Sequence, residues 1–274
     1  RIFCWFASMY AFVGVFLARI LEKPSYLVVG GVDAAKNEEL GYGIWLNKFK
    51  AILLKYTVRK VKSVFVVDNS LKENLIHLAN YDGKNIIYLP TGYDIEFWKP
   101  MGPKEKIVLT VALVRNVVTW KVKGLDLLVD TARKLPDVSF IVVGVRSDFA
   151  DIYKPPYNIK FIEPVRRENL LPLYQRAMVY CQPSRVEGLS NALCEAMACG
   201  CIPVATSVGG NPTAVGNVGI LVPPDDSIKL AFALKKALSL PESYGVNARA
   251  RIVSIFPWDK RKEKLLEILR EEES

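Results

Sequence analysis

Short apolar runs alternate with longer amphipathic stretches along the chain, and this alternation predicts alternating β-strands and α-helices. In the first hundred residues the predicted strands are 2–6, 26–29, 64–67 and 86–89, and the predicted helices are 9–21, 44–61 and 71–79. Further on, the predicted strands are 107–113, 139–143, 159–162, 179–182, 202–206 and 220–222, and the helices are 124–134, 167–176, 191–199, 212–215, 227–238 and 258–273. This order predicts an α/β fold with a doubly wound parallel sheet.

The turn-forming sequence Met101-Gly102-Pro103-Lys104 separates these two halves and is typical of a linker. We therefore expect a first domain at residues 1–100 and a second domain at 101–256. The charged amphipathic segment 257–274 follows as a final helix.

The opening run at residues 2–18 is almost uninterruptedly apolar and admits two readings. It approaches the lower length limit of a membrane-spanning helix. Alternatively it is a strand followed by a helix, capped by Ser8 and buried in the domain. The sequence continues as an α/β pattern without a break, which favours the buried helix. No small-residue cleavage site occurs before Pro24, which argues against a signal peptide.

The charge balance of this 274-residue chain points to anionic partners. Its formal net charge is +9, with a pI near 9.2, so nucleoside diphosphates and acidic lipid surfaces are favoured. No basic block interleaved with aromatic residues occurs, which argues against nucleic acid. The five cysteines are an odd number without zinc spacing. They predict core residues in a reducing, cytoplasmic compartment and no disulfide framework.

One stretch in the second half carries the strongest chemical signal. A predicted strand, 177–181, is followed by a loop, a helix at 191–199 and a strand at 202–206. Ser190 stands at the N-cap position of the helix, and Gly200 lies just past its end. This order predicts parallel strands, with the loop at the carboxyl edge where open α/β sheets bind ligands.

The start of this helix is a predicted anion site. The backbone N–H groups of Leu189, Ser190 and Asn191 would point out of the helix and could hold a diphosphate. Glu187 lies in the loop before the helix and Glu195 lies inside it. Carboxylates beside a phosphate site suit sugar and ribose hydroxyls, because they would repel the phosphate itself.

Taken together, this stretch resembles the signature of the retaining GT-B glycosyltransferases of family 4. Glu187 and Glu195 match its two glutamates, seven residues apart, and an Ala-Met-Ala-Cys-Gly run and a Val-Gly-Gly loop follow in register. The resemblance implies that Glu187 acts catalytically on the sugar hydroxyls and that Glu195 binds the ribose. Gly188 and the three amides that follow it would bind the donor.

Other segments extend the resemblance. Lys121-Val122-Lys123-Gly124 matches the family's Lys-Gly segment, which implies that Lys123 meets the donor diphosphate. The family's earlier arginine is displaced here, and Arg115 is the candidate replacement. Val165 and Arg166 would contact the base, mainly through backbone atoms.

The segment Gly30-Gly31-Val32-Asp33 resembles the family's His-Gly-x-Asp loop, which contacts the donor. Gly30 stands in place of the histidine, whereas Gly31 and Asp33 are retained. The same glycines are also typical of a turn at a strand end. Both readings stay open.

The predicted helix 44–61 carries five basic residues among apolar ones. A solvated face is one reading. The other is a contact with a membrane surface, for a peripheral protein that acts on a lipid-linked acceptor.

The resemblance implies two Rossmann-like domains that face a cleft, with the final helix crossing back to the first. The first domain would be incomplete, because the family carries roughly seventy more residues before this point. We expect a hexosyltransferase that moves sugar from a UDP-, GDP- or ADP-linked donor to a saccharide or lipid-linked acceptor, in polysaccharide or glycolipid biosynthesis. No Asp-x-Asp clamp is present, so no metal cofactor is expected. A nucleotide-sugar 2-epimerase, a non-catalytic nucleotide-binding remnant and a membrane-anchored protein remain alternatives.

Overall fold

The computed structural model describes residues 1–271, and they form two compact units. Unit 1 contains residues 1–91, 187–189 and the described chain from Glu263 onward. Unit 2 contains residues 92–186 and 190–262. The chain thus passes from unit 1 to unit 2 between Thr91 and Gly92, whereas the sequence placed a domain boundary after residue 100.

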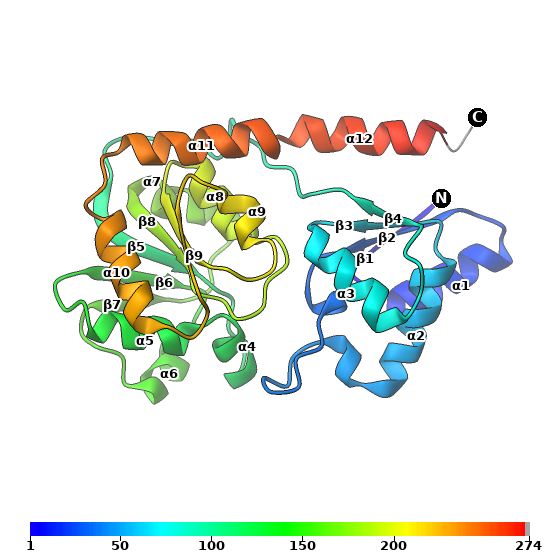
Figure 1. Cartoon of the computed structure of the whole chain (residues 1–274), viewed down its shortest axis with the longest axis horizontal. Helices are drawn as coiled ribbons and strands as arrows, with labels where there is room; N and C mark the ends of the chain where they lie inside the picture. The colour runs from blue at the N-terminus through cyan, green and yellow to red at the C-terminus, as the bar shows by residue number, and fades with distance from the viewer. Residues whose placement is uncertain (272–274) are drawn as a thin grey trace. The chain divides into compact units, whose positions relative to one another are not determined.

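In the described part of unit 1, parallel strands form a sheet in the order β1-β2-β3-β4 (Figure 1). Their bounds are β1 (Ile2–Trp5), β2 (Ser25–Val29), β3 (Ser63–Val66) and β4 (Ile86–Tyr88). The helices of this unit are α1 (Met9–Ile20), η1 (Val32–Ala34), η2 (Ile44–Leu46), α2 (Lys48–Lys60) and α3 (Asn69–Ala79). Strands β2 and β3 are buried along their whole length, as expected for central strands of a parallel sheet.

Helix α1 is where the prediction for unit 1 was wrong. The helix exists and Ser8 caps it, since its Oγ accepts from the Ala11 N–H. It is not buried, however. Only Ala11, Val15 and Ala18 of the helix are buried, and most of its larger apolar side chains are exposed. Among residues 1–271 no helix combines the length and the apolarity that crossing a bilayer requires.

In the described part of unit 2, parallel strands form a sheet in the order β10-β9-β8-β5-β6-β7. The bounds are β5 (Glu105–Val111), β6 (Ser139–Val143), β7 (Ile159–Ile162), β8 (Ala177–Gln182), β9 (Ile202–Thr206) and β10 (Ile220–Val222). The strand order reverses at β5, because β6 lies on one side of it and β8 on the other. Ligands of open α/β sheets bind at the carboxyl ends of the strands around such a point.

The helices of unit 2 from α4 to α9 lie between successive parallel strands, and α10 and α11 follow the last strand (Figure 1). Their bounds are α4 (Val117–Val122), α5 (Leu125–Arg133), α6 (Ser147–Ala150), η3 (Asp151–Tyr153), η4 (Arg167–Leu170), α7 (Leu171–Arg176), α8 (Asn191–Ala198), α9 (Asn211–Val215), α10 (Ser227–Ala237) and α11 (Ser243–Ile255). Helices α4, α6 and α11 were not predicted. The long helix α11 buries only Gly245, Ala248 and Ile252, so its apolar stripe is too weak to see in the sequence.

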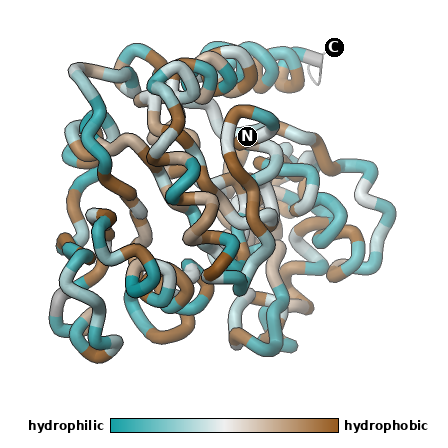
Figure 2. The backbone as a smooth tube through the Cα atoms, turned by 60° about the vertical axis from the view of Figure 1, so that its left-hand side comes forward, coloured by the Kyte–Doolittle hydropathy of each residue, from teal (hydrophilic) through white to brown (hydrophobic). Residues whose placement is uncertain are grey.

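Helix α12 (Trp258–Glu271) ends the described chain. In Figure 2 it carries hydrophilic and hydrophobic residues in alternation, as expected for a helix with one exposed charged face. Its residues up to Lys262 belong to unit 2, and those from Glu263 belong to unit 1. Within unit 1, Arg1 donates to the Leu269 carbonyl at 3.2 Å.

Candidate functional site

The start of α8 in unit 2 is anchored to the carboxyl end of β8. Ser190 caps the helix, since its Oγ accepts from the Leu193 N–H at 3.3 Å. The same hydroxyl donates to Gln182 Oε1 at 3.0 Å, and Gln182 is the last residue of β8. The N-cap prediction is therefore confirmed. The hydrogen bond fixes the helix N-terminus relative to the strand edge.

Tyr93 supports the first turn of α8 from another part of unit 2. Its hydroxyl donates to Asn191 Oδ1 at 3.0 Å. The Tyr93 side chain is fully buried, and burial is the main reason why its pKa lies well above the ordinary value. Tyr93 therefore stays a neutral donor at physiological pH and holds the Asn191 amide in one orientation.

Glu195 lies one turn further along α8 and is almost completely buried, with a side chain that is 3% exposed. Arg167 donates from Nε to Glu195 Oε1 at 2.7 Å. The Tyr174 hydroxyl donates to Oε2 at 3.3 Å. Burial raises the pKa of the Glu195 carboxyl, and the Arg167 charge and both hydrogen bonds oppose that rise.

Arg167 is held in turn by an aromatic ring. Its guanidinium carbon lies 5.4 Å from the centre of the Trp98 ring, within the range of a cation–π interaction. Trp98 packs edge-on against Tyr174, which is the second donor to Glu195. Glu195, which the sequence predicted to bind the ribose, therefore lies at the centre of a polar cluster. The pairing of Arg167 with Glu195 was not predicted, because it joins positions 28 residues apart in the sequence.

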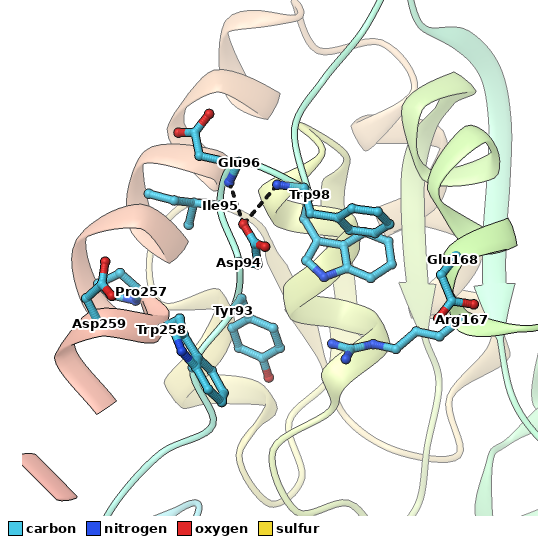
Figure 3. Close-up of a pocket in the computed structure, with 12 residues that line it drawn as sticks. Tyr93, Asp94, Ile95, Glu96, Trp98, Arg167, Glu168, Pro257, Trp258 and Asp259 are labelled. Atoms are coloured by element: carbon cyan, nitrogen blue, oxygen red, sulfur yellow. Dashed lines mark hydrogen bonds between the residues drawn. The ribbon is translucent and has the colours of Figure 1, made fainter. Parts of the chain in front are cut away.

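A cavity of about 560 Å³ opens beside this cluster, within unit 2 (Figure 3). Residues 92–98 form one wall, Arg167 and Glu168 a second, and Pro257, Trp258 and Asp259 a third. In Figure 3 the Arg167 guanidinium points towards Tyr93. The Asp94 carboxylate accepts from the N–H groups of Glu96 and Phe97, each at 3.0 Å, so it shapes the wall. The sequence did not predict this cavity.

The segment that contains Lys123 is fixed against the loop after β8. Lys123 ends α4, and Gly124 adopts φ +65° before α5 begins. A Cβ atom on Gly124 would lie 1.9 Å from the Pro183 carbonyl oxygen. Only glycine permits both the left-handed backbone and this close approach.

Arg185 connects the Lys123 segment to the loop after β8. Its role was not predicted from the sequence. Its guanidinium donates to both carboxylate oxygens of Asp126, at 2.7 and 2.9 Å, and to the Lys121 carbonyl at 2.6 Å. A further bond reaches Asp225 at 2.6 Å. The side chain of Arg185 is only 18% exposed. This pairing gives Asp126, which lies two residues after Gly124, a structural role.

The remaining predicted residues of unit 2 lie in exposed loops. Arg115 precedes α4, and its backbone N–H donates to Thr119 Oγ1 at 3.0 Å. Val165 and Arg166 follow β7 and are exposed. Ser190, Asn191 and Glu195 are gathered at α8, whereas Arg115, Val165 and Arg166 lie in other loops, before α4 and after β7.

The predicted residues of unit 1 form a tight loop after β2. The buried Asp33 carboxylate accepts from the N–H groups of Ala7, Gly30 and Gly31 at 3.0, 3.1 and 2.8 Å. Burial raises its pKa, and these hydrogen bonds oppose the rise. A Cβ on Gly30 would lie 2.7 Å from the Phe6 ring, so a larger residue at this position would require the Phe6 side chain to move. Glu187, Gly188 and Leu189 also group with unit 1.

The described residues contain no group of three or more His, Cys, Asp or Glu side chains that could hold a metal ion. The site is thus built from amides, cations and carboxylates. Such a set can bind an anion with attached hydroxyls.

The chain is similar to known proteins in sequence and in fold. Residues 106–239 match the family of glycosyl transferases group 1. Apart from residues 187–189, which group with unit 1, that match lies within unit 2, and it includes the Lys123 segment, Arg167, Arg185 and α8.

Among curated proteins, a D-inositol 3-phosphate glycosyltransferase of Mycobacterium sp. (strain KMS) is 30% identical over 199 residues, which cover 64% of this chain and 44% of the relative. The phosphatidylinositol N-acetylglucosaminyltransferase gpi3 subunit of Schizosaccharomyces pombe is 27% identical over 171 residues, or 58% of this chain and 37% of the relative. The chain therefore spans less than half the length of these two relatives.

Among solved structures, Anabaena HepE in complex with UDP and glucose matches with a TM-score of 0.82 at 18% identity. The match covers 98% of this chain and 78% of that one. At this identity the likeness shows the fold alone. It confirms the predicted α/β architecture of the GT-B type, with parallel Rossmann-like sheets.

Proposed function

We propose that this chain is the part of a glycosyltransferase that binds a nucleoside diphosphate sugar and transfers its sugar with retention of anomeric configuration. The observation that carries the proposal is the anchored N-terminus of α8, with Glu195 buried behind it, inside the segment that matches glycosyl transferases group 1. The names of the curated relatives, which are sugar transferases, support the reaction class.

The donor diphosphate is proposed to meet the N–H groups at the start of α8 and the Lys123 ammonium. A helix N-terminus stabilises anions through free N–H groups and the helix dipole. Glu195 would accept from ribose hydroxyls, with Arg167 keeping the carboxylate ionised. Glu187 would accept from hydroxyls of the sugar. We propose that UDP is the preferred nucleotide among UDP, GDP and ADP, because a protein of the same fold has been solved with it.

In the proposed reaction, the bond between the anomeric carbon and the phosphate oxygen breaks, and its electron pair leaves with the diphosphate. An acceptor hydroxyl oxygen forms the new bond on the same face of the sugar and gives up its proton to the leaving phosphate oxygen. The transition state resembles an oxocarbenium ion. Amide and cationic donors therefore act mainly by stabilising the charge that develops on the diphosphate. No step in this scheme uses a metal ion.

The acceptor is proposed to be a hydroxyl group of a saccharide or of a lipid-linked molecule, on the cytoplasmic side of a membrane. The retaining family 4 assignment and the role in polysaccharide or glycolipid synthesis belong to the same proposal. The basic pI near 9.2 supports an anionic donor and an anionic membrane surface.

Isothermal titration calorimetry of the whole chain with UDP, GDP and ADP tests the donor site. We expect binding of at least one nucleotide and a roughly 10- to 100-fold loss of affinity in Glu195→Ala, because a charge-assisted hydrogen bond to a ligand is lost. Glu105→Ala, an exposed glutamate paired with Arg176, is the matched control. Absence of binding by all three nucleotides would contradict the proposal.

A further inference from the structure

Helix α1 in unit 1 presents its apolar side chains to solvent. The face that packs against the unit consists of the small residues Ala11, Val15 and Ala18. The exposed large residues recur every three or four positions along the opposite face; they are Met9, Val13, Phe16, Leu17 and Ile20. Val13 is 50% exposed and Ile20 is 62% exposed. A helix in water normally turns such a stripe inward, so this one indicates a partner.

Helix α2 packs beside α1 and extends the surface. Phe12 of α1 meets Tyr56 of α2 edge to face, with ring centres 5.5 Å apart. On α2, Phe49 and Ile52 are exposed by 62% and 65%. The two helices together carry six basic residues and no acidic one; they are Arg19, Lys48, Lys50, Lys55, Arg59 and Lys60. The surface is therefore both apolar and strongly positive.

A cavity of about 360 Å³ lies between these helices, within unit 1. Its lining contains two cations, Arg19 and Lys60, and three apolar or aromatic side chains, Phe16, Ile20 and Tyr56. Cations above apolar walls suit an amphiphile that has a phosphate at one end and hydrocarbon at the other.

We propose that the outward face of α1 and α2 docks on an anionic lipid surface and that the cavity takes a lipid phosphate between Arg19 and Lys60. The apolar stripe would enter the boundary between headgroups and acyl chains, and the basic residues would pair with lipid phosphates. A second copy of the chain fits this face less well, because it would bring two positively charged surfaces together. The proposal concerns unit 1 alone. It rests on the membrane-side acceptor of the proposed function and adds the face and the phosphate site that would contact the lipid.

Flotation of the whole chain with lipid vesicles tests the proposal. We expect little binding to phosphatidylcholine vesicles and strong binding once phosphatidylglycerol is added, with a loss of binding at high salt. Arg19→Gln combined with Lys60→Gln should weaken binding to the mixed vesicles roughly tenfold or more, because each cation near an anionic surface contributes to binding. Lys235→Gln combined with Lys236→Gln on α10 is the matched charge control.

The apolar contribution is tested with Val13→Asp and, separately, Ile20→Asp. Both positions are at least half exposed, so we expect unchanged thermal unfolding and lost vesicle binding. Ile228→Asp on α10, an equally exposed apolar position, should bind vesicles like the unchanged chain. UDP binding by all variants, measured by calorimetry, keeps this test separate from that of the donor site.

Three outcomes would overturn the proposal. One is equal binding to both vesicle types. Another is unchanged vesicle binding in both aspartate variants. The third is a dimer seen by light scattering that Val13→Asp dissociates, which would show that a second copy covers the face.

Discussion

The Nε atom of Arg167 lies 2.7 Å from Oε1 of Glu195 in unit 2. The two partners differ in environment, since the side chain of Glu195 is 3% exposed and that of Arg167 is 58% exposed. A buried carboxylate is costly unless a cation and hydrogen bonds compensate it. Arg167 therefore determines whether Glu195 is ionised and how it is oriented. A ligand that binds Glu195 must share it with Arg167.

Replacing Arg167 by methionine should weaken UDP binding. Without the nearby cation the pKa of Glu195 should rise further, so a larger fraction of the protein would hold a neutral carboxyl at a given pH. We expect an affinity loss of roughly tenfold, which should shrink as the pH is raised. Calorimetry at several pH values measures both effects, with Arg176→Met, an exposed ion-paired arginine, as control. Tighter binding would instead mean that Arg167 blocks the carboxylate.

The raised pKa of Glu195 also predicts a pH dependence of stability. The native state holds this proton more tightly than the unfolded state, whose carboxyl titrates near the ordinary value of 4.5. Stability contributed by this group should therefore fall as the pH rises from that value through the raised pKa, and stay level above it. The difference in unfolding free energy between the unchanged chain and Glu195→Gln, from urea titrations, should show this fall. A difference that is independent of pH would refute the prediction.

Gly124 and Gly102 form a matched pair for backbone strain. Both have positive φ, +65° and +71°, but a Cβ on Gly102 would meet nothing within 4 Å. Gly102→Ala should cost about 1–2 kcal/mol, the cost of a left-handed backbone for a residue with a Cβ. Gly124→Ala should cost clearly more, because its Cβ would overlap the Pro183 carbonyl. Urea unfolding of both variants measures the difference, and equal costs would speak against the observed packing.

Removing the Arg185 side chain should destabilise unit 2 and loosen the Lys123 segment. Arg185→Met leaves Asp126 without its paired guanidinium, and breaking a largely buried pair of this kind costs about 3 kcal/mol. The more exposed pair of Arg176 with Glu105 should cost less than about 1 kcal/mol when broken by Arg176→Met. We expect reduced UDP affinity in the first variant only. Similar stability losses in both would contradict this difference in burial.

Local signals in the sequence were sufficient for much of the fold. Ser190 and Ser8 were expected to cap helices, and both side chains accept from the first helical turn. The parallel sheets followed from apolar runs of strand length that alternate with amphipathic stretches. Signals of this kind depend on neighbours a few residues apart, and the sequence shows such neighbours directly.

What could not be predicted depends on residues that are distant in sequence. The pairs of Arg167 with Glu195 and of Arg185 with Asp126 join different elements, and no periodicity marks them. The burial of helix α1 was predicted wrongly for another reason. An apolar helix suggests burial, but its sequence does not show which face packs against the sheet. In α1 the face with the small residues packs, and the large apolar residues stay exposed. The chemical roles of residues were therefore easier to predict than their burial and their distant partners.

The cysteine thiols of the two units differ in burial, so a thiol reagent can report on each unit separately. Cys181, Cys194, Cys199 and Cys201 are buried in unit 2, and burial raises the pKa of the Cys201 thiol to about 11. Cys4, in unit 1, is only partly buried. A thiol-specific dye should therefore label Cys4 first, and the others only when unit 2 opens. Mass spectrometry of a labelling time course would measure the labelling rate of each cysteine, and so the rate at which each unit opens, with no engineered probe.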